Sequence, residues 1–493
     1  MLKQAVFTKR PAVIYVFFAA FAFLHLFITV TNHYLFRTFS YDYAVYNFAF
    51  YDFAHFRVSP CRIYHNLNNV TFLQDHFSLT LVILSPLYWL LHWITQSYTL
   101  LLIQWFFIAC GGWCTFKLIE QKTKSYWIAL LSLVYYYIIY GRYSSYQADC
   151  NLAIMGSALV PVFIWWFLQR KIILCTLLFI FLIVNREDFS LYLAFVCLFL
   201  VIVSRKNKQQ QKFALVLAAS SVLIFILTFS VFIPALESET KKFNLFNYSR
   251  LGETPLQALL FIFQHPFETL KLLVTNSSGD PANDWIKASF YIVYGLSGGV
   301  LLLFRPVYLI VLTPLIAKKM FNDDTLRWGY EMYYSVEIAT ILPFLVFSVI
   351  SEFGNEKLRI AGSVAVCVFT CSVTLYCLSI IQYPGITNFK FNFLRSSFYK
   401  PDYNVSEINR ALKLVPANAA VSSTGRIMPH LAMRDKIYYF PNVWDADYVC
   451  AYKTGDSYPV SQEEFDKVLK VLENSDRWET IANKGDFIIL KRK

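Results

Sequence analysis

A chain of 493 residues is long enough for roughly two or three soluble domains, but 57% of its residues are hydrophobic and only 15% are charged. Soluble domains contain about 45–50% apolar and about 25% charged residues, so this composition excludes a protein that is soluble along most of its length. The net charge of +12 comes from Lys and Arg scattered between apolar runs, which argues against nucleic acid as a partner.

Eleven apolar runs predict membrane-spanning helices, although the runs at 172–185 and 306–317 are short for a bilayer. The eleven runs cover residues 12–31, 99–118, 125–140, 152–168, 172–185, 189–204, 213–233, 287–304, 306–317, 338–352 and 360–381. Another apolar stretch, 79–94, is interrupted by Pro86 and ends among Trp and His side chains. We therefore predict an interfacial or re-entrant helix there.

The distribution of Lys and Arg between the predicted helices indicates an orientation. With the N-terminus inside, every inner loop is basic. One outer loop, which contains Lys318 and Lys319, goes against the rule. We expect an integral protein of the plasma (inner) membrane with a cytoplasmic N-terminus and an extracytoplasmic C-terminus.

Two domains are predicted. Residues 1–384 form a transmembrane domain with outer loops at about 32–78 and 234–286, and residues 385–493 form a small extracytoplasmic α/β domain. The tail has ordinary charge, strand-like runs at 419–423, 436–440, 447–451 and 487–490, and an amphipathic helix at 461–474. The sequence contains no glycine-rich nucleotide-binding motif, so a soluble nucleotide-dependent reaction is not supported.

Asp42 is the first candidate for chemistry. It lies just past the first predicted helix, among Tyr41, Tyr43, Tyr46 and Phe48. Apolar surroundings raise the pKa of a carboxyl group and suit it to act as a general base. The alternative is an interfacial aspartate that caps a short helix.

Acidic side chains also fall elsewhere on the predicted outer side. Asp75 with His76 fits acid–base chemistry, half of a metal site, or a helix cap beside a histidine. Asn185-Arg186-Glu187-Asp188 joins two apolar runs, where ionisable groups are costly unless they are paired or solvated. An ordinary solvated turn is the alternative there. Asp149 occupies a similar outer position.

An aromatic cluster follows farther along the chain. Glu331, Tyr333 and Tyr334 lie close to Trp328 in the sequence. They form either an interfacial aromatic belt or the mouth of a site for a sugar or a lipid headgroup. The predicted orientation rests on Lys and Arg alone. The gathering of these acidic and aromatic residues on one predicted face is therefore a separate observation.

At these residues the sequence resembles domain-of-unknown-function family 2079, bacterial and archaeal membrane proteins grouped with the GT-C glycosyltransferases. Tyr41-Asp42 is similar to the family's Phe-Asp-Leu-Gly-Ile opening, and Arg186-Glu187-Asp188 is similar to a Glu-Asp element. The ordered matches cover nearly the whole chain and include Asp75-His76-Phe77-Ser78, Ser85-Pro86-Leu87-Tyr88, Leu251-Gly252 within residues 248–255, and the segments 415–417, 429–432 and 438–441.

The sequence departs from the family pattern at three places. Tyr43-Ala44 stands where Leu-Gly is usual, Asn47 stands where a second Asp is common, and Tyr333-Tyr334 stands where His-Tyr is often seen. A role that needs the second acid or the histidine is therefore in doubt. Asp42 itself matches.

The resemblance implies a GT-C-like fold and transfer of a hexose or pentose from a polyprenyl-phosphate donor to an envelope acceptor at the outer membrane face. Asp42 would be the general base, and Glu187 or Asp188 would orient the acceptor or hold a divalent metal. The candidates for offsetting the leaving phosphate are Arg57, Arg62, Arg142 and Arg186. Further candidates for substrate binding are Asp75, His76, Asp149, Glu331, Tyr333 and Tyr334.

Two other classes of function compete with a transferase. A transporter or flippase for a lipid-linked substrate predicts ionisable residues deep inside helices and clear internal repeats. The sequence has few of the former and no obvious repeat. A non-catalytic membrane scaffold that presents the outer tail is the remaining reading.

Overall fold

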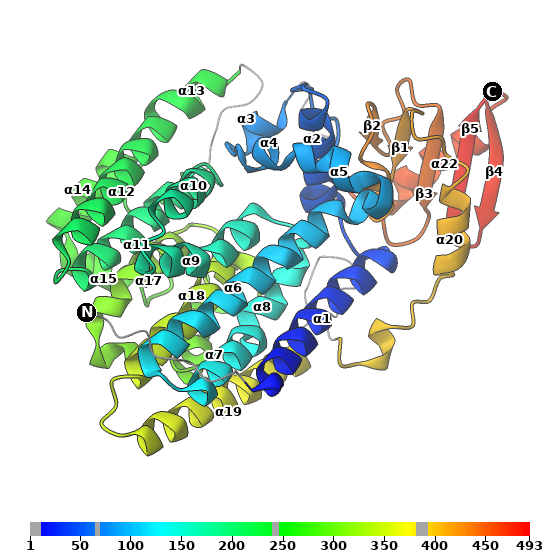
Figure 1. Cartoon of the computed structure of the whole chain (residues 1–493). Helices are drawn as coiled ribbons and strands as arrows, with labels where there is room; N and C mark the ends of the chain where they lie inside the picture. The colour runs from blue at the N-terminus through cyan, green and yellow to red at the C-terminus, as the bar shows by residue number, and fades with distance from the viewer. Residues whose placement is uncertain (1–10, 65–69, 239–245, 381–392) are drawn as a thin grey trace.

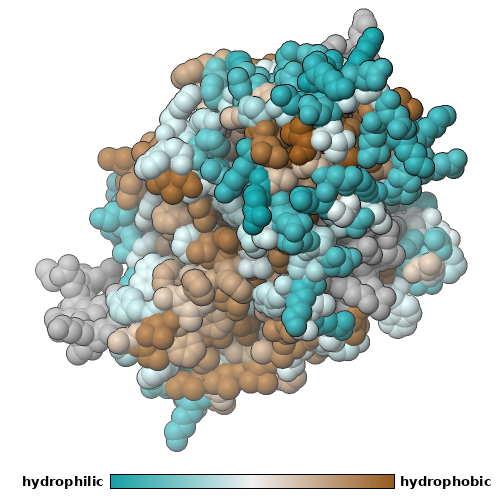
Figure 2. All heavy atoms as spheres, turned by 90° about the vertical axis from the view of Figure 1, so that its right-hand side faces the viewer, coloured by the Kyte–Doolittle hydropathy of each residue, from teal (hydrophilic) through white to brown (hydrophobic). Residues whose placement is uncertain are grey.

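Apolar helices occupy the chain as far as Ile380, and one small sheet follows near the C-terminus (Figure 1). The computed structural model describes residues 11–64, 70–238, 246–380 and 393–493. Seen from the side of the C-terminal sheet, hydrophilic atoms gather in the upper part of the molecule and hydrophobic atoms in the lower part (Figure 2). This division is typical of a protein that is partly embedded in a membrane.

Five helical stretches in the described part of the chain are long and apolar enough to cross a membrane. These are Ala12–Tyr34, Pro86–Thr123, Lys208–Leu236, Tyr333–Ile350 and Glu356–Ile380. Shorter apolar helices occupy most of the other predicted runs. The structure therefore supports a helical membrane protein with five candidate spans, and the eleven crossings remain a prediction.

The helices of the bundle lie close to the predicted runs. They are α1 (Ala12–Tyr34), α6 (Thr99–Thr123), α7 (Tyr126–Ile138), α9 (Leu152–Leu168), α10 (Ile172–Ile183), α11 (Phe189–Val203), α12 (Lys208–Leu227), α16 (Ile286–Leu296), α17 (Leu309–Met320), α18 (Val336–Ile350) and α19 (Glu356–Ile380).

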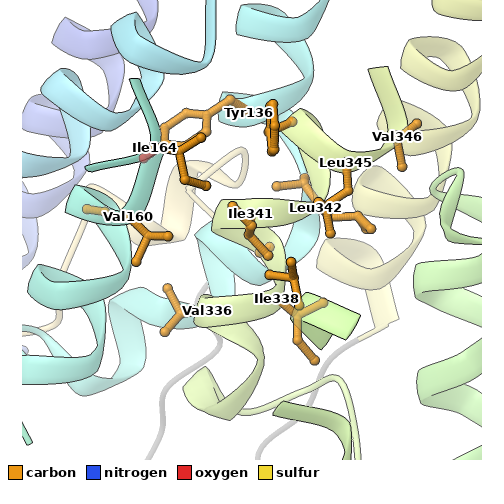
Figure 3. Close-up of a cluster of buried hydrophobic side chains, with 14 of the residues drawn as sticks. Tyr136, Val160, Ile164, Val336, Ile338, Ile341, Leu342, Leu345 and Val346 are labelled. Carbon is orange, nitrogen blue, oxygen red and sulfur yellow. The ribbon is translucent and has the colours of Figure 1, made fainter. Parts of the chain in front are cut away.

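Helix α18 is the centre of the bundle. Every one of its residues is buried, and it packs against α6, α7 and α9. Its Ile341, Leu342 and Leu345 lie in one apolar cluster with Tyr136 from α7 and Val160 from α9 (Figure 3). A helix that is apolar on all sides is stable only when neighbouring helices or lipid cover it, and here the neighbours are helices.

One predicted helix, 287–304, is interrupted in the structure. Helix α16 ends at Leu296, and the chain continues as a 3-10 helix, η6 (Gly299–Phe304). Gly298 has φ 96°, a left-handed conformation that glycine adopts without the penalty of a side chain. The sequence predicted one continuous helix because Gly298 and Gly299 lie within an apolar run.

The apolar stretch 79–94 also divides. It forms α4 (Thr80–Leu84) and α5 (Pro86–Thr95), each too short to cross a bilayer alone. The 3-10 helix η2 (Gln96–Tyr98) then leads into α6, so that α5 to α6 counts as one candidate span. The indole of Trp89 in α5 donates a hydrogen bond to the carbonyl of Ala54, at 2.9 Å.

The two predicted outer loops contain helices. The first has a π-helical turn, η1 (Ser40–Ala44), followed by α2 (Val45–Ala54) and α3 (Phe72–Asp75). The second has α13 (Ile233–Leu236), α14 (Pro255–Gln264) and α15 (Pro266–Leu272). Short helices also join the bundle helices, namely α8 (Tyr140–Ser144), η3 (Ser145–Ala148), η4 (Thr228–Phe232), η5 (Pro281–Asn283), η7 (Pro306–Tyr308), η8 (Thr325–Arg327) and η9 (Tyr333–Ser335).

The C-terminal domain contains a five-stranded sheet of order β2-β1-β3-β5-β4, in which β2, β1 and β3 are parallel and β5 pairs antiparallel with β3 and β4. Val421 pairs with Ile437 on one side and Tyr448 on the other. The elements are α20 (Val405–Leu412), β1 (Val421–Ser423), α21 (Met428–Leu431), β2 (Ile437–Tyr439), β3 (Tyr448–Tyr452), α22 (Gln462–Glu473), β4 (Trp478–Lys484) and β5 (Phe487–Arg492), with η10 (Ser396–Phe398) before them.

The predicted strands and the helix at 461–474 are confirmed, whereas α20 and β4 were not predicted. Strand β4 is mostly polar and exposed, so it lacks the apolar alternation that marks a half-buried strand. The predicted domain boundary at 384/385 lies outside the described residues.

The C-terminal domain rests on the segment that follows α1. A shared apolar cluster contains Tyr43 and Phe50 from that segment together with Val421 and Met428 from the domain. The amide of Asn47 donates a hydrogen bond to the carbonyl of Pro429, at 3.1 Å. These contacts place the domain beside η1, the turn that contains Asp42.

Candidate functional site

Asp42 lies in the π-helical turn η1, directly before α2. Single π-helical turns are rare in proteins, and many of those that occur lie at functional sites. The Asp42 side chain is partly buried, and this burial raises its pKa to about 7, although a hydrogen bond from Asn151 opposes the effect. A carboxyl group with such a pKa can accept and release a proton near neutral pH.

Asp149 holds the start of this turn. Its Oδ2 accepts a hydrogen bond from the backbone N–H of Phe39 at 2.9 Å, and its Oδ1 accepts one from the amide of Asn32 at 3.0 Å. The side chain of Gln104 donates to the Asp149 carbonyl at 2.8 Å. Asp149 is buried, and its φ of 52° is a conformation that non-glycine residues rarely adopt.

The environment of Asp149 also affects its own charge. Burial raises the pKa of Asp149 well above its usual value, and the nearby Asp42 adds to the rise, while the hydrogen bonds from Phe39 and Asn32 oppose it. Both carboxyl oxygens already accept hydrogen bonds inside the protein. The arrangement therefore favours a role in positioning η1 over direct contact with a substrate.

Tyr46 connects Asp42 to the second group of acids. Burial raises the pKa of Tyr46, the charges of Asp42 and Glu187 raise it further and that of Arg186 lowers it, so all three lie within electrostatic range of its hydroxyl. The Tyr46 ring also stacks on that of His76, with 6.3 Å between centroids and 9° between planes. Residues from three separate parts of the chain thus lie near one tyrosine.

Arg186 and Asp188 belong to a four-residue charge cluster. Arg186 binds Asp188 through Nε at 2.6 Å and Nη2 at 2.8 Å, and its Nη2 also donates to Glu337 at 3.0 Å. Lys318 donates to Asp188 at 3.0 Å and to Glu337 at 2.6 Å. Although burial works in the opposite direction, Arg186 and Lys318 hold the pKa of Asp188 well below its usual range. The cluster contains equal numbers of cations and carboxylates.

Glu187 stands apart from this cluster. Its Oε2 is buried and has no hydrogen-bond partner within the described part of the chain, and the same holds for Oδ1 of Asn185. Burial and the adjacent Asp188 raise the pKa of Glu187. A buried acceptor without a donor costs free energy, so Glu187 is suited to accept a hydrogen bond from a bound hydroxyl group.

The other residues predicted to lie on the outer side also make specific contacts. His76 Nε2 is 3.5 Å from Asp75 Oδ2. Tyr333 lies within electrostatic range of Asp42, and its ring is 4.3 Å from that of Tyr334. Glu331 is half-buried, and its carbonyl accepts a hydrogen bond from the Tyr140 hydroxyl at 3.5 Å.

Three of the four predicted arginines lie elsewhere. Arg57 pairs with Asp52 at 3.1 Å and with Asp435 of the C-terminal domain at 2.8 Å. Arg62 lies over the rings of two aromatic side chains of that domain. Arg142 is fully buried in the bundle, where its Nη2 donates to Thr340 at 2.9 Å. Arg186 is the one of these four arginines that the structure places around Tyr46 with Asp42.

Several residues of this centre were not among the sequence-based candidates. Asn32, Gln104 and Asn151 support Asp42 and Asp149, and Lys318 with Glu337 completes the charge cluster. Polar side chains inside or beside apolar runs are a usable signal for Asn32 and Gln104. Lys318 had already been noted as an exception to the charge rule, and its two ion pairs give that exception a physical reason.

A metal site can be assessed only within residues 11–64, 70–238, 246–380 and 393–493. There, no three His, Cys, Asp or Glu side chains are grouped so that they could hold a metal ion. The possible divalent metal at Glu187 or Asp188 is therefore not supported by a ligand set in this part of the chain, and no step is assigned to it below.

The apolar bundle, its five candidate spans and the small α/β domain define a helical membrane protein. The sequence profile of a family described as "Predicted membrane protein (DUF2079)" matches residues 32–488, and the chain belongs to this family. No curated protein matches the chain. The match begins at residue 32 and ends at residue 488, in β5, so it includes every residue of the centre described above.

Proposed function

We propose that the protein is a membrane glycosyltransferase that transfers a sugar from a polyprenyl-phosphate donor to a hydroxyl group of an envelope acceptor. The observation that carries this proposal is the position of Asp42 on a π-helical turn just past α1, within electrostatic range of Tyr46 and Tyr333. The resemblance of Tyr41-Asp42 to the Phe-Asp-Leu-Gly-Ile opening of a family grouped with the GT-C glycosyltransferases supports the same assignment.

In this reaction the acceptor hydroxyl loses its proton to Asp42, and its oxygen forms a bond to the anomeric carbon of the donor sugar. The bond between that carbon and the phosphate oxygen breaks, and the electron pair leaves with the polyprenyl phosphate. Asp42 then releases the proton to solvent. A base with a pKa near neutrality suits both halves of this cycle.

Arg186 and Glu187 serve the two ends of the reacting pair in this proposal. Arg186 shares the environment of Tyr46 with Asp42, and its guanidinium offsets the charge of the departing phosphate. Because Asp188 and Glu337 also bind Arg186, its planar group is held in one orientation. The unpartnered Oε2 of Glu187 accepts a hydrogen bond from a sugar or acceptor hydroxyl.

The proposal is tested by transfer of label from polyprenyl-phosphate hexoses and pentoses in vesicles that contain the purified protein. We expect wild-type transfer to increase with pH through about 7, as Asp42 loses its proton. Asp42→Asn should abolish transfer at every pH because an amide cannot accept the proton. Asp476→Asn, which changes an exposed aspartate of the C-terminal domain, is the matched control and should behave as wild type.

Three results would overturn the assignment. Full transfer by Asp42→Asn would show that Asp42 is not the base. Movement of the lipid-linked sugar across the vesicle membrane without a covalent product would identify a transporter or flippase. Loss of function on removal of the C-terminal domain, with a harmless Asp42→Ala, would identify a scaffold.

A further inference from the structure

An apolar stripe runs along the exposed side of α14 and α15. Within α14 its four members lie at positions i, i+3, i+4 and i+7, and the two within α15 are three residues apart, which places the members of each helix on one face. His265 joins the two helices: its N–H donates to the Phe261 carbonyl at 2.7 Å and its carbonyl accepts from the Thr269 N–H at 2.9 Å, while its φ of −124° and ψ of 57° mark a break between them. The stripe consists of Leu256, Leu259, Leu260, Phe263, Phe267, Leu270 and Val274, all of them exposed.

The opposite side of the same segment is packed against the bundle. Ala258 and Phe261 belong to an apolar cluster with Ala317 and Phe321 at the end of α17. The ammonium group of Lys287 in α16 donates to the Leu272 carbonyl at 2.7 Å. The segment is therefore held in place, and the stripe cannot turn toward the core that its other face already contacts.

The exposure of the stripe argues against a loop that is surrounded by water. Phe263 is 76% exposed and Phe267 is 86% exposed. Water-soluble proteins rarely leave a contiguous apolar patch of this extent in contact with water. We therefore expect another molecule to contact this surface.

The surroundings of the stripe indicate what kind of molecule contacts it. Exposed apolar side chains continue along the chain through α16 and η6, the segment predicted to cross the membrane, at Trp285, Ile292, Leu296, Val300, Leu303 and Phe304. The polar residues beside the stripe include Glu268 and Lys271, one of each charge, so no charged partner is selected. In Figure 1, α14 and α15 lie on the far side of the bundle from the C-terminal sheet.

We propose that the stripe on α14 and α15 contacts phospholipid acyl chains at the membrane boundary. Residues 255–274, predicted from the sequence to lie in an outer loop, are then an amphipathic segment in the surface of the bilayer. Trp285, with its exposed indole, marks the same boundary from the start of α16. This inference does not depend on the transferase proposal, because it concerns the lipid and not the reaction.

The test uses the photoreactive amino acid benzoylphenylalanine, placed singly at Phe263 or Phe267 in the full-length protein. Matched variants carry it at the neighbouring exposed polar positions Gln264 and Glu268. Each variant is reconstituted in phosphatidylcholine vesicles and illuminated, and lipid adducts are measured by mass spectrometry. Size-exclusion elution identical to wild type shows that each variant is folded.

We expect several-fold more phospholipid adduct from positions 263 and 267 than from positions 264 and 268. Equal and low adduct formation at all four positions would place the segment in water and overturn the proposal. A crosslink between two protein chains at positions 263 and 267, in place of the lipid adduct, would also overturn it, because the stripe would then cover a second copy. Replacing part of the phosphatidylcholine with anionic lipid should leave the adduct yield unchanged.

Discussion

The carboxyl group of Asp42 is expected to make the folded protein less stable as the pH rises. Its pKa increases from 3.8 to about 7 on folding, so the folded chain holds a proton that the unfolded chain has lost in this interval. The free-energy penalty for burying the charged carboxylate is absent below pH 3.8 and grows between pH 3.8 and about 7. Above about pH 7 it is complete, at on the order of 4 kcal/mol.

We therefore predict that Asp42→Asn increases the melting temperature in alkaline buffer and leaves it nearly unchanged in acidic buffer. The amide has no charge to bury, which removes the pH-dependent penalty. The measurement is the Tm of purified protein at several pH values. A variant that is destabilised equally at every pH would show that the carboxylate is solvated or paired in the folded protein, and that its pKa is not raised.

Asp149 has a different expected effect, because its oxygens satisfy two donors inside the protein. Asp149→Ala leaves the N–H of Phe39 and the amide of Asn32 without their acceptor, at a cost of about 1–3 kcal/mol each. We predict a lower Tm and a large loss of transfer, since η1 loses its anchor. Asp149→Asn keeps one acceptor and tolerates the positive φ, so it should fall between Ala and wild type. Wild-type transfer by Asp149→Ala would contradict the positioning role.

At the level of helices, the charge cluster ties the chain before α11 to α17 and α18. Lys318→Met leaves two carboxylates with one cation, and we predict a loss of about 2–3 kcal/mol, reduced from the fully buried case because Lys318 is partly exposed. Adding Glu337→Gln restores the charge balance, so the double variant should be less destabilised than the sum of its parts. Together with the wild type, the two single variants and the double variant form a double-mutant cycle, in which the Tm of each protein is measured. Simple additivity would show that the two residues do not interact.

The bundle helices could be predicted because their apolar runs are separated by Lys and Arg, and α9 spans the same residues in the structure as in the sequence-based prediction. The break at Gly298 could not, because an apolar run is compatible with either a continuous or an interrupted helix. Asp42 could be singled out from its local setting. Its support by Asp149 could not, since Asn32 and Asp149 are 117 positions apart and no local pattern joins them.

At the scale of the whole molecule, the C-terminal domain is attached by buried contacts more than by surface charges. The Arg57–Asp435 pair is exposed on both sides, and such pairs contribute about 0–1 kcal/mol. The half-buried imidazole of His430, by contrast, stacks on the buried His33 of α1 with 3.9 Å between centroids. Removing it leaves a cavity between the domains.

We predict that His430→Ala exposes the C-terminal domain to protease, whereas Asp435→Ala leaves its cleavage rate unchanged. Limited proteolysis of the two variants in vesicles, with the fragment 393–493 followed over time, measures the difference. Circular dichroism shows whether each variant keeps its secondary structure. The opposite order of sensitivity would mean that the exposed ion pair, and not the stacked rings, holds the domain.

The four-residue charge cluster also has a consequence for how the protein is made. Arg186 and Asp188 leave the ribosome long before Lys318, and Glu337 follows last. A nascent chain that has reached α17 but not α18 therefore has two cations of the cluster and only one carboxylate. Glu337 completes the neutral set when α18 joins the bundle. The final placement of α17 during biosynthesis thus waits for a helix that has yet to be translated.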